Sequence, residues 1–192
     1  MSTLNATNLK NPSSGSNNIV LNTDGTTTIT TPSNIIKSGT AVASTSGTSI
    51  DFTSIPSWVK RITVMFDGVS TSGTSNILVQ LGDSGGVETS GYRGSSMITS
   101  STALQTLAMT TGILVYDNGL TAADLSNGVI TILNITSNTW VFQGNIALSN
   151  TNETRLLAGA KTLDATLDRI RITTVNGTDT FDAGTVNILY EG

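Results

Sequence analysis

The feature that most limits the fold of this chain is a repeated alternation of apolar and polar residues between residue 40 and the C-terminus. In RITVMF, Ile62, Val64 and Phe66 share one side, and in RIRITT, Ile170 and Ile172 lie opposite the arginines between them. Successive side chains of a strand point to opposite faces, so this period of two predicts strands with one buried face. An antiparallel sheet with one solvated face has this pattern.

Clusters of Gly, Asn, Ser and Asp separate the alternating runs, as expected for turns between short strands. Helical periodicity is nearly absent, and only residues 120–128 suggest a single helical turn, with Thr121 as its N-cap. The pattern predicts an all-β protein whose body is an antiparallel β-sandwich, jelly-roll-like in form. We expect strands near residues 40–45, 48–53, 60–67, 76–81, 110–116, 128–135, 139–148, 154–165, 167–174 and 184–190.

The charge and cysteine content exclude several classes of function. Charged residues make up 11% of the chain, and the net charge is −4. Without a basic run, nucleic-acid binding is not expected. Without His or Cys, the common zinc ligands and disulfides are absent, so we expect no metal and no cofactor. No apolar run approaches the roughly 20 residues of a membrane-spanning helix, and the N-terminus has no secretory pattern, so membrane insertion is not expected.

The run GDSGG at residues 82–86 resembles the surroundings of a protease nucleophile, which would be Ser84. A serine hydroxyl needs a base to take its proton, and in the protease triad that base is histidine. Because the chain has no histidine, we interpret GDSGG as a turn after the strand at residues 76–81. We expect that the protein is not an enzyme.

Two pairs of carboxylates are the remaining acid–base candidates: Asp164 with Asp168, and Asp179 with Asp182. A glycosidase needs two carboxylates on either side of a sugar, and Ca²⁺ prefers oxygen ligands, so both readings stay open. Aspartates in Gly- and Thr-rich turns more often bond to the local backbone, and we favour that interpretation.

Residues 1–39 differ from the rest of the chain, with few large apolar side chains and no aromatic residue. Residues 16–29 predict a β-hairpin that turns at Thr23-Asp24-Gly25. A lone hairpin is marginally stable in water, so this segment needs a partner. We expect residues 1–39 to be an anchoring segment with an interface formed by Ile19, Val20, Leu21 and Ile29, and residues 40–192 to form the body.

Three aromatic positions and one arginine are candidate contact or core residues. Residues 82–109 read as a long polar loop, and long loops in compact domains are often functional. In it, Tyr92 and Arg93 have the residue types enriched at binding hot spots. Trp58, after Pro56, is as compatible with a covering role as with an interface. Trp140 lies in an alternating strand and is expected in the core.

Three stretches resemble modules of tail-fibre and other virion proteins of tailed bacteriophages. They are residues 38–71, which contain SIDFTSIPSWVKRITVMFDG, residues 139–192, which end in LDRIRITTVNGTDTFDAGTVNILYEG, and the N-terminal MSTLNATNLKNPSSGSNNIVLNTDGTTTI. The resemblance implies a β-rich virion appendage, usually a homotrimer, whose N-terminus is anchored on the particle. It carries no catalytic residue to this chain.

The resemblance leads us to expect a virion structural protein, assembled in the host cytoplasm. Residues 1–39 would bind capsid or tail proteins, and a trimeric body would contact a host-surface glycan or decorate the particle as a short head or tail fibre. Tyr92, Arg93 and Trp58 are the expected contact residues. One alternative is a capsid cement protein with no ligand. Another, less favoured, is a virion glycan depolymerase that uses Asp179 or Asp182.

Overall fold

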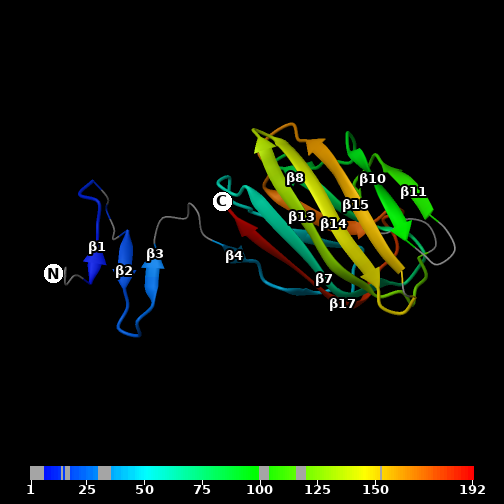
Figure 1. Ribbon diagram of the computed structural model, residues 1–192, viewed down its shortest axis with the longest axis horizontal. Coiled ribbons are helices and arrows are strands. Elements are labelled where there is room, and N and C mark those ends of the chain that lie inside the picture. Colours follow the sequence, from blue (N-terminus) through cyan, green and yellow to red (C-terminus); the bar gives the residue numbers. More distant parts are fainter. Residues whose placement is uncertain are drawn as a thin grey trace. The chain divides into compact units, whose positions relative to one another are not determined.

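The computed structural model describes residues 7–13, 15, 18–29, 36–99, 104–115, 120–151 and 153–192. The chain divides into an N-terminal unit, Met1–Ile35, and a body, Ile36–Gly192 (Figure 1). The division falls a few residues before the expected one at residue 39. The reason is that strand β4 (Lys37–Ser38) already pairs with the last strand of the body, β17 (Phe181–Glu191).

The N-terminal unit contains a three-stranded antiparallel sheet. Strands β2 (Ile19–Leu21) and β3 (Thr27–Ile29) form the predicted hairpin. In its turn, Gly25 has a φ of 84°, and the Asp24 carboxylate accepts a bond of 2.9 Å from the Thr26 amide. Strand β1 (Asn8–Leu9) pairs with β2 and was not expected, because two residues leave too short a pattern to recognise.

The body consists of two antiparallel sheets. Among the residues that the structure describes there is no helix, and so no helix that is long and apolar enough to cross a bilayer. The nine-stranded sheet has the order β11 (Leu104–Met109), β10 (Arg93–Thr99), β15 (Glu153–Thr162), β14 (Thr139–Leu148), β13 (Ser126–Thr136), β7 (Arg61–Thr71), β17 and β4, with β5 (Val42–Ala43) also paired to β17. The five-stranded sheet has the order β12 (Ile113–Leu114), β8 (Ile77–Asp83), β16 (Arg169–Thr174) and β6 (Ser49–Phe52), with β9 (Gly86–Val87) paired to β8. The all-β, antiparallel sandwich is confirmed.

The chain passes repeatedly between the two sheets, as it does in a jelly roll. Strands β6, β7 and β8 alternate between the small and the large sheet, and β16 returns late in the sequence to lie between β6 and β8. A three-stranded meander, β13–β14–β15, forms the centre of the large sheet. Figure 1 shows this meander in front of β8.

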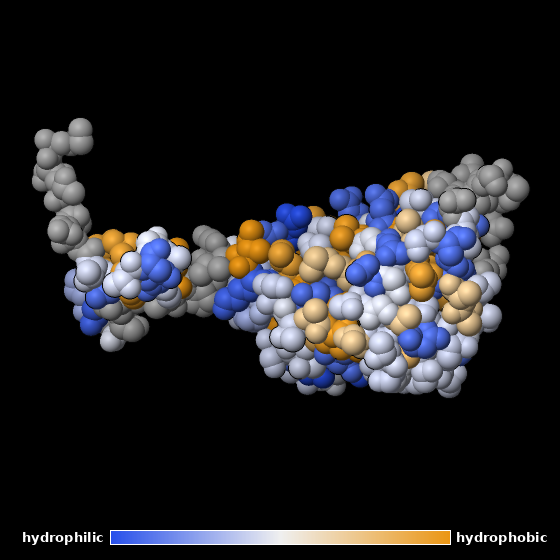
Figure 2. Space-filling view, turned by 90° about the horizontal axis from the view of Figure 1, so that it is seen from below, coloured by the Kyte–Doolittle hydropathy of each residue, from blue (hydrophilic) through white to orange (hydrophobic). Residues whose placement is uncertain are grey.

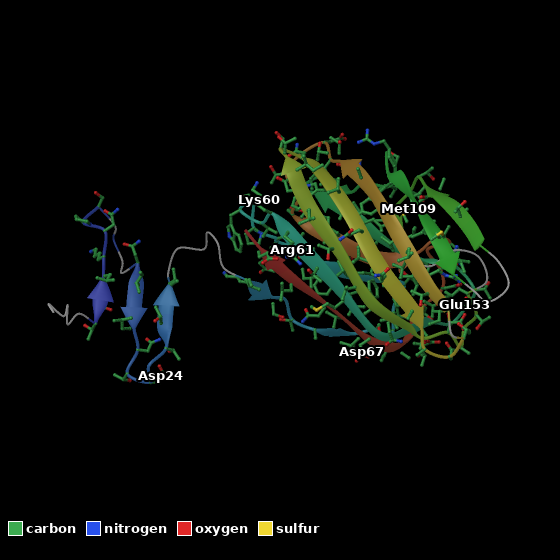
Figure 3. All side chains as sticks on the ribbon, viewed as in Figure 1. Asp24, Lys60, Arg61, Asp67, Met109 and Glu153 are labelled. Carbon is green, nitrogen blue, oxygen red and sulfur yellow. The ribbon has the colours of Figure 1, made fainter. Side chains whose placement is uncertain are left out.

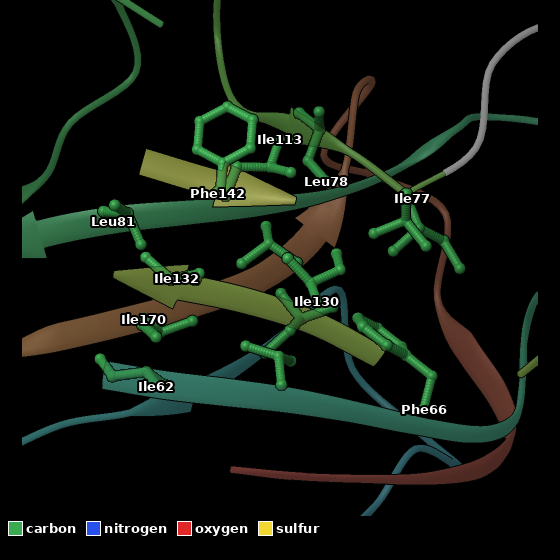
Figure 4. Close-up of a cluster of buried hydrophobic side chains, with 14 of the residues drawn as sticks. Ile62, Phe66, Ile77, Leu78, Leu81, Ile113, Ile130, Ile132, Phe142 and Ile170 are labelled. Carbon is green, nitrogen blue, oxygen red and sulfur yellow. The ribbon is translucent and has the colours of Figure 1, made fainter. Parts of the chain in front are cut away.

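The core lies between the sheets and is built from the inward positions of the alternating strands. Side chains from both sheets point into this space (Figure 4). The predicted inward residues are buried, at 5% exposed or less: Ile62, Val64 and Phe66 of β7, and Ile170 and Ile172 of β16. Trp140 is 4% exposed, which confirms its place in the core.

The segment 82–109 is not the long loop that the sequence suggested. Strand β8 extends to Asp83, a tight turn follows at Ser84-Gly85, and β9 begins at Gly86, so GDSGG is a turn as predicted. Asp83 stabilises this turn by accepting a bond of 2.7 Å from the Gly85 amide. Strands β10 and β11 occupy most of the remainder. The Gly and Ser residues of β10 hid it from the pattern, because pairing with β15 and β11 decides its conformation.

The expected helical turn at residues 120–128 is also absent. Asp124 is buried, and its carboxylate accepts a bond of 2.7 Å from the Thr121 amide. The Asp124 amide in turn donates to the Thr121 carbonyl oxygen. This reciprocal pair closes a turn rather than a helix, and β13 begins at Ser126.

Candidate functional site

The N-terminal sheet carries a row of aliphatic side chains on one face. Leu9 pairs with Ile19, and Ile19 pairs with Ile29, so the three lie side by side across the sheet. Leu21, two residues after Ile19, shares this face. Val20 lies on the opposite face with Thr28. Three of the expected interface residues are therefore brought together, and Leu9 joins them.

This aliphatic row is largely open to solvent within its own unit. Leu9 is 43% exposed, Leu21 47% and Ile29 50%. Figure 2 shows hydrophobic side chains at the surface of the unit. Complete burial of an aliphatic side chain of this size contributes about 1.5–3 kcal/mol of stabilising free energy. A sheet with strands of two or three residues is marginally stable alone, so the row is a candidate docking surface of this unit.

On the body, Trp58 takes part in an aromatic and cationic cluster at the end of β17. Its ring lies 5.9 Å from that of Tyr190 at an interplanar angle of 52°. The Lys37 ammonium lies 5.8 Å from the Trp58 ring centroid, within the range of a cation–π interaction. Trp58 is half-buried and packs against the core, so it both covers the sandwich and presents part of its ring outward.

A groove next to this cluster combines an aromatic ring with polar groups. Tyr190 and Ile188 of β17 line it together with Asp51 of β6 and Ser54. Ser54 has a φ of 61°, a left-handed conformation that costs energy for a residue other than glycine and recurs at binding sites. Asp51 accepts two bonds from the Arg171 guanidinium, at 2.7 and 3.0 Å. The groove suits a small polar ligand with an apolar face.

Tyr92 and Arg93, which the sequence suggested together as contact residues, differ in burial: Tyr92 directly precedes β10 and is buried, whereas Arg93 begins β10. Tyr92 is 4% exposed, and its hydroxyl accepts a bond of 2.7 Å from the Leu81 amide of β8. Burial raises the pKa of the Tyr92 hydroxyl well above its ordinary value. The reading of Tyr92 as a surface contact is therefore corrected: it fastens the large sheet to β8. Arg93 is exposed.

The charged side chains packed near Tyr92 pair with one another and have a structural role. Lys161 is 4% exposed and forms an ion pair with Glu88, while its ammonium lies 5.6 Å from the Tyr92 ring centroid. Glu88 further accepts a bond of 2.7 Å from the Asp164 amide. This cluster ties the turn after β15 to the segment after β9.

Three of the four carboxylates considered for catalysis are held by hydrogen bonds or an ion pair of the scaffold. Asp179 accepts bonds from the Ser75 amide at 2.9 Å and from the Asn176 side chain at 2.8 Å, and the Asn176 bond is the main reason that the pKa of Asp179 is lowered. Asp182 accepts a bond from the Ser70 hydroxyl. Asp168 pairs with Arg169 at 2.7 Å. Among the described residues, no three potential ligands gather into a metal site.

Comparisons of the chain with protein-family models, with curated proteins and with solved structures gave no match. The candidate sites are therefore assigned from the chain itself. The two candidate sites are the aliphatic row of the N-terminal sheet and the groove beside Trp58. The sequence indicated Ile19, Leu21, Ile29 and Trp58, but it did not indicate the groove. Asp51 lies in the five-stranded sheet and Tyr190 in the nine-stranded sheet, so these residues come close only when the two sheets pack together.

Proposed function

We propose that this protein is a structural subunit of a tailed-bacteriophage virion, a short homotrimeric fibre or decoration protein. The N-terminal unit attaches the chain to a capsid or tail protein, and the body carries its outward contacts. The protein acts by binding and has no catalytic step and no cofactor. Its site of action is the virion, after assembly in the host cytoplasm.

The observation that carries this proposal is the aliphatic row of Leu9, Ile19 and Ile29 on a sheet too small to cover it. A face of this kind is stabilised by docking onto a partner, because burial of its exposed side chains offsets the cost of ordering the unit. The sequence resemblance of the N-terminal stretch to phage structural leaders supplies the class of partner. Low charge limits ionic contacts, which suits attachment through apolar packing.

The groove beside Trp58 supports a contact with host-surface glycan. The Tyr190 ring offers a face for a sugar, and Asp51, Ser54 and the local backbone offer hydrogen-bonding groups. Arg93 is exposed on another part of the body, so a contact shared by Arg93 and Trp58 is not part of the proposal. A virion whose adsorption is unaffected by Tyr190→Ala would instead carry the protein as a cement subunit.

The attachment role is tested with two neighbouring substitutions in β3. Ile29→Asn places a polar group in the aliphatic row, whereas Thr28→Asn makes a similar change on the opposite face. Each variant is supplied to a phage that lacks the gene, and purified virions are assayed for the protein by quantitative immunoblot. We expect Thr28→Asn to be incorporated like the natural chain and Ile29→Asn to be reduced at least tenfold. Equal incorporation of both variants would rule out docking through this row.

A further inference from the structure

A positively charged side chain, Lys37 of β4, lies beside the groove near Trp58. Lys37 is directly opposite Tyr190 of β17 in the strand register, so the two side chains project from the same face of the large sheet. Tyr190 lines the groove, and so does Gly39, two residues after Lys37. The register therefore places the Lys37 ammonium next to the groove, on the side where β4 and β17 meet.

Lys37 differs from the other cations at this end of the body, Lys60 and Arg61 (Figure 3). Arg61 forms an ion pair with Glu191 at 3.0 Å, and the Lys60 ammonium donates a bond of 3.4 Å to the Asn134 side chain. Among the residues that the structure describes, Lys37 pairs with no carboxylate. The charge of Lys37 is therefore available to a ligand, whereas that of Arg61 is already balanced.

The Trp58 ring holds the Lys37 ammonium in place without occupying all of its donors. The ammonium nitrogen lies 5.8 Å from the ring centroid, and Trp58 itself packs against Tyr190 and the core. An ammonium group has three N–H donors, and a cation–π contact engages its charge without supplying a carboxylate or carbonyl acceptor. Lys37 can thus donate a charge-assisted hydrogen bond to an anion, and no ion pair has to be broken first.

Asp51, the carboxylate on the side of the five-stranded sheet, does not cancel this positive charge. The Arg171 guanidinium donates two bonds to Asp51, at 2.7 and 3.0 Å, so these two side chains balance one another. Each oxygen of Asp51 keeps a lone pair that can accept a bond from a ligand hydroxyl. The groove therefore combines a neutral ion pair on one side with the unbalanced charge of Lys37 on the other.

Hydroxyl groups supply further polar lining. Thr53, Ser54 and Tyr190 line the groove, and within the described part of the chain none of their hydroxyls has a hydrogen-bond partner. Each of these hydroxyls can donate or accept a bond. The Tyr190 ring adds an apolar face to this polar set. A pyranose ring has the matching chemistry, because its apolar face is bordered by hydroxyls.

We infer that the groove binds an acidic sugar residue, whose carboxylate accepts a hydrogen bond from Lys37 while its ring lies against Tyr190. Its hydroxyls contact Asp51 and Ser54. A neutral sugar would match the ring and the hydroxyls but would leave the charge of Lys37 unbalanced, so charge complementarity selects the acid. The inference rests on the glycan contact of the proposed function and specifies a sugar that carries a negative charge.

Matched pairs of sugars test this specificity: the methyl glycosides of glucuronic, galacturonic and mannuronic acid, and those of glucose, galactose and mannose. The members of a pair differ only at their sixth carbon, where a carboxylate replaces a hydroxymethyl group. Dissociation constants are measured with the full chain by ligand-observed NMR titration. Because the net charge of the chain is −4, it does not attract anions from a distance, so a preference for the acid reports a local contact.

Two substitutions that each remove one positive charge locate this contact. Lys37→Gln removes the ammonium beside the groove, and the matched control Arg93→Gln removes a charge from β10, which β15, β14, β13 and β7 separate from β17. We expect at least one acid to bind the natural chain and Arg93→Gln about tenfold more tightly than its neutral counterpart, and Lys37→Gln to lose this preference. Lys37→Arg keeps the charge and should retain most of the preference.

A sugar that binds equally well in its acidic and neutral forms, or a preference for the acid that survives in Lys37→Gln, would overturn the acidic-sugar assignment and leave the proposed glycan contact standing. If none of these sugars binds, the inference fails together with the glycan contact. The attachment role of the N-terminal unit is decided separately, by the incorporation of Ile29→Asn and Thr28→Asn into virions.

Discussion

At the scale of single residues, Tyr92 and Arg93 show how the face of a strand decides the role of a side chain. They are adjacent in sequence, yet Tyr92 lies in the core and Arg93 lies in solvent. Alternation predicted the inward residues of β7 and β16 because Ile and Val mark their buried face. On β10 the buried face carries Ser96, which is 1% exposed, and only one aliphatic residue, Ile98, so the apolar signal is weak and did not predict the burial of Tyr92.

The substitution Tyr92→Phe is expected to destabilise the body, because it leaves the Leu81 amide without its partner in the core. An unsatisfied buried donor costs about 1–3 kcal/mol. The measurement is the free energy of unfolding in urea, with Tyr190→Phe as a control at a half-buried site, where we expect a change of less than about 1 kcal/mol. If Tyr92→Phe were as stable as the natural chain, the assigned role of this hydroxyl would be wrong.

The same tyrosine predicts an alkaline limit to stability. Its pKa is raised in the folded state by burial, so the folded protein resists ionisation that the unfolded chain allows. The stabilisation is complete below the unfolded pKa of about 10 and is lost as the pH rises above it. Between about pH 9 and about pH 11, we expect the natural chain to lose more free energy of unfolding than the Tyr92→Phe variant does. An equal loss of unfolding free energy with pH in the two proteins would contradict this role of Tyr92.

Asp179 predicts the opposite behaviour in acid. Its pKa is lowered, first by the Asn176 side chain and then by the Ser75 amide. The stabilisation is therefore present above the unfolded pKa of about 4 and is lost as the pH falls through the lower folded value. Asp179→Asn should flatten thermal stability against pH below about pH 4, whereas Asp67→Asn, another exposed carboxylate, serves as the control. If the thermal stability of Asp179→Asn fell with acid as steeply as that of the natural chain, Asp179 would not contribute to the acid sensitivity.

At the scale of elements, strands with a clean period of two could be predicted, and short or Gly-rich strands could not. Strand β14 was predicted at its observed bounds, Thr139–Leu148, because Trp140, Phe142 and Ile146 mark one face. Strand β1 has only two residues, and β10 begins Arg-Gly-Ser-Ser. Their conformation depends on neighbours distant in sequence, which local propensity does not report.

The pairing of β7 with β17 depends on two glycines that face one another. Gly184 has a φ of 92°, and a Cβ there would lie 2.4 Å from the backbone of Gly68, which has a φ of 62°. Gly184→Ala should cost about 3 kcal/mol or more, from backbone strain and the clash together. Gly177→Ala is the matched control, because its φ of 66° is similar but nothing lies within 4 Å. Gly177→Ala should lower the free energy of unfolding by only about 1 kcal/mol, measured by thermal or urea unfolding. Equal costs would contradict the close approach.

At the scale of the whole molecule, the sandwich could be predicted but its strand order could not. Period-two alternation identifies a buried face without saying which strand lies beside it, and β16 between β6 and β8 is a long-range choice. The aliphatic row is likewise a product of register: Leu9, Ile19 and Ile29 align only once the strands of the N-terminal sheet have paired. The N-terminal hairpin was the exception, because an Asp-Gly turn between alternating runs is a local signal.

The measurement that tests the central claim most directly is immunogold electron microscopy of virions of the tailed phage that we propose encodes this chain, with antibody raised against the body. Gold at a fixed position on intact virions, around the capsid or at the tail, is the predicted result and would also identify the attachment point. Virions that carry no gold, from infections in which the protein is abundant in the host cytoplasm, would contradict the proposal that this protein is a structural subunit of the particle.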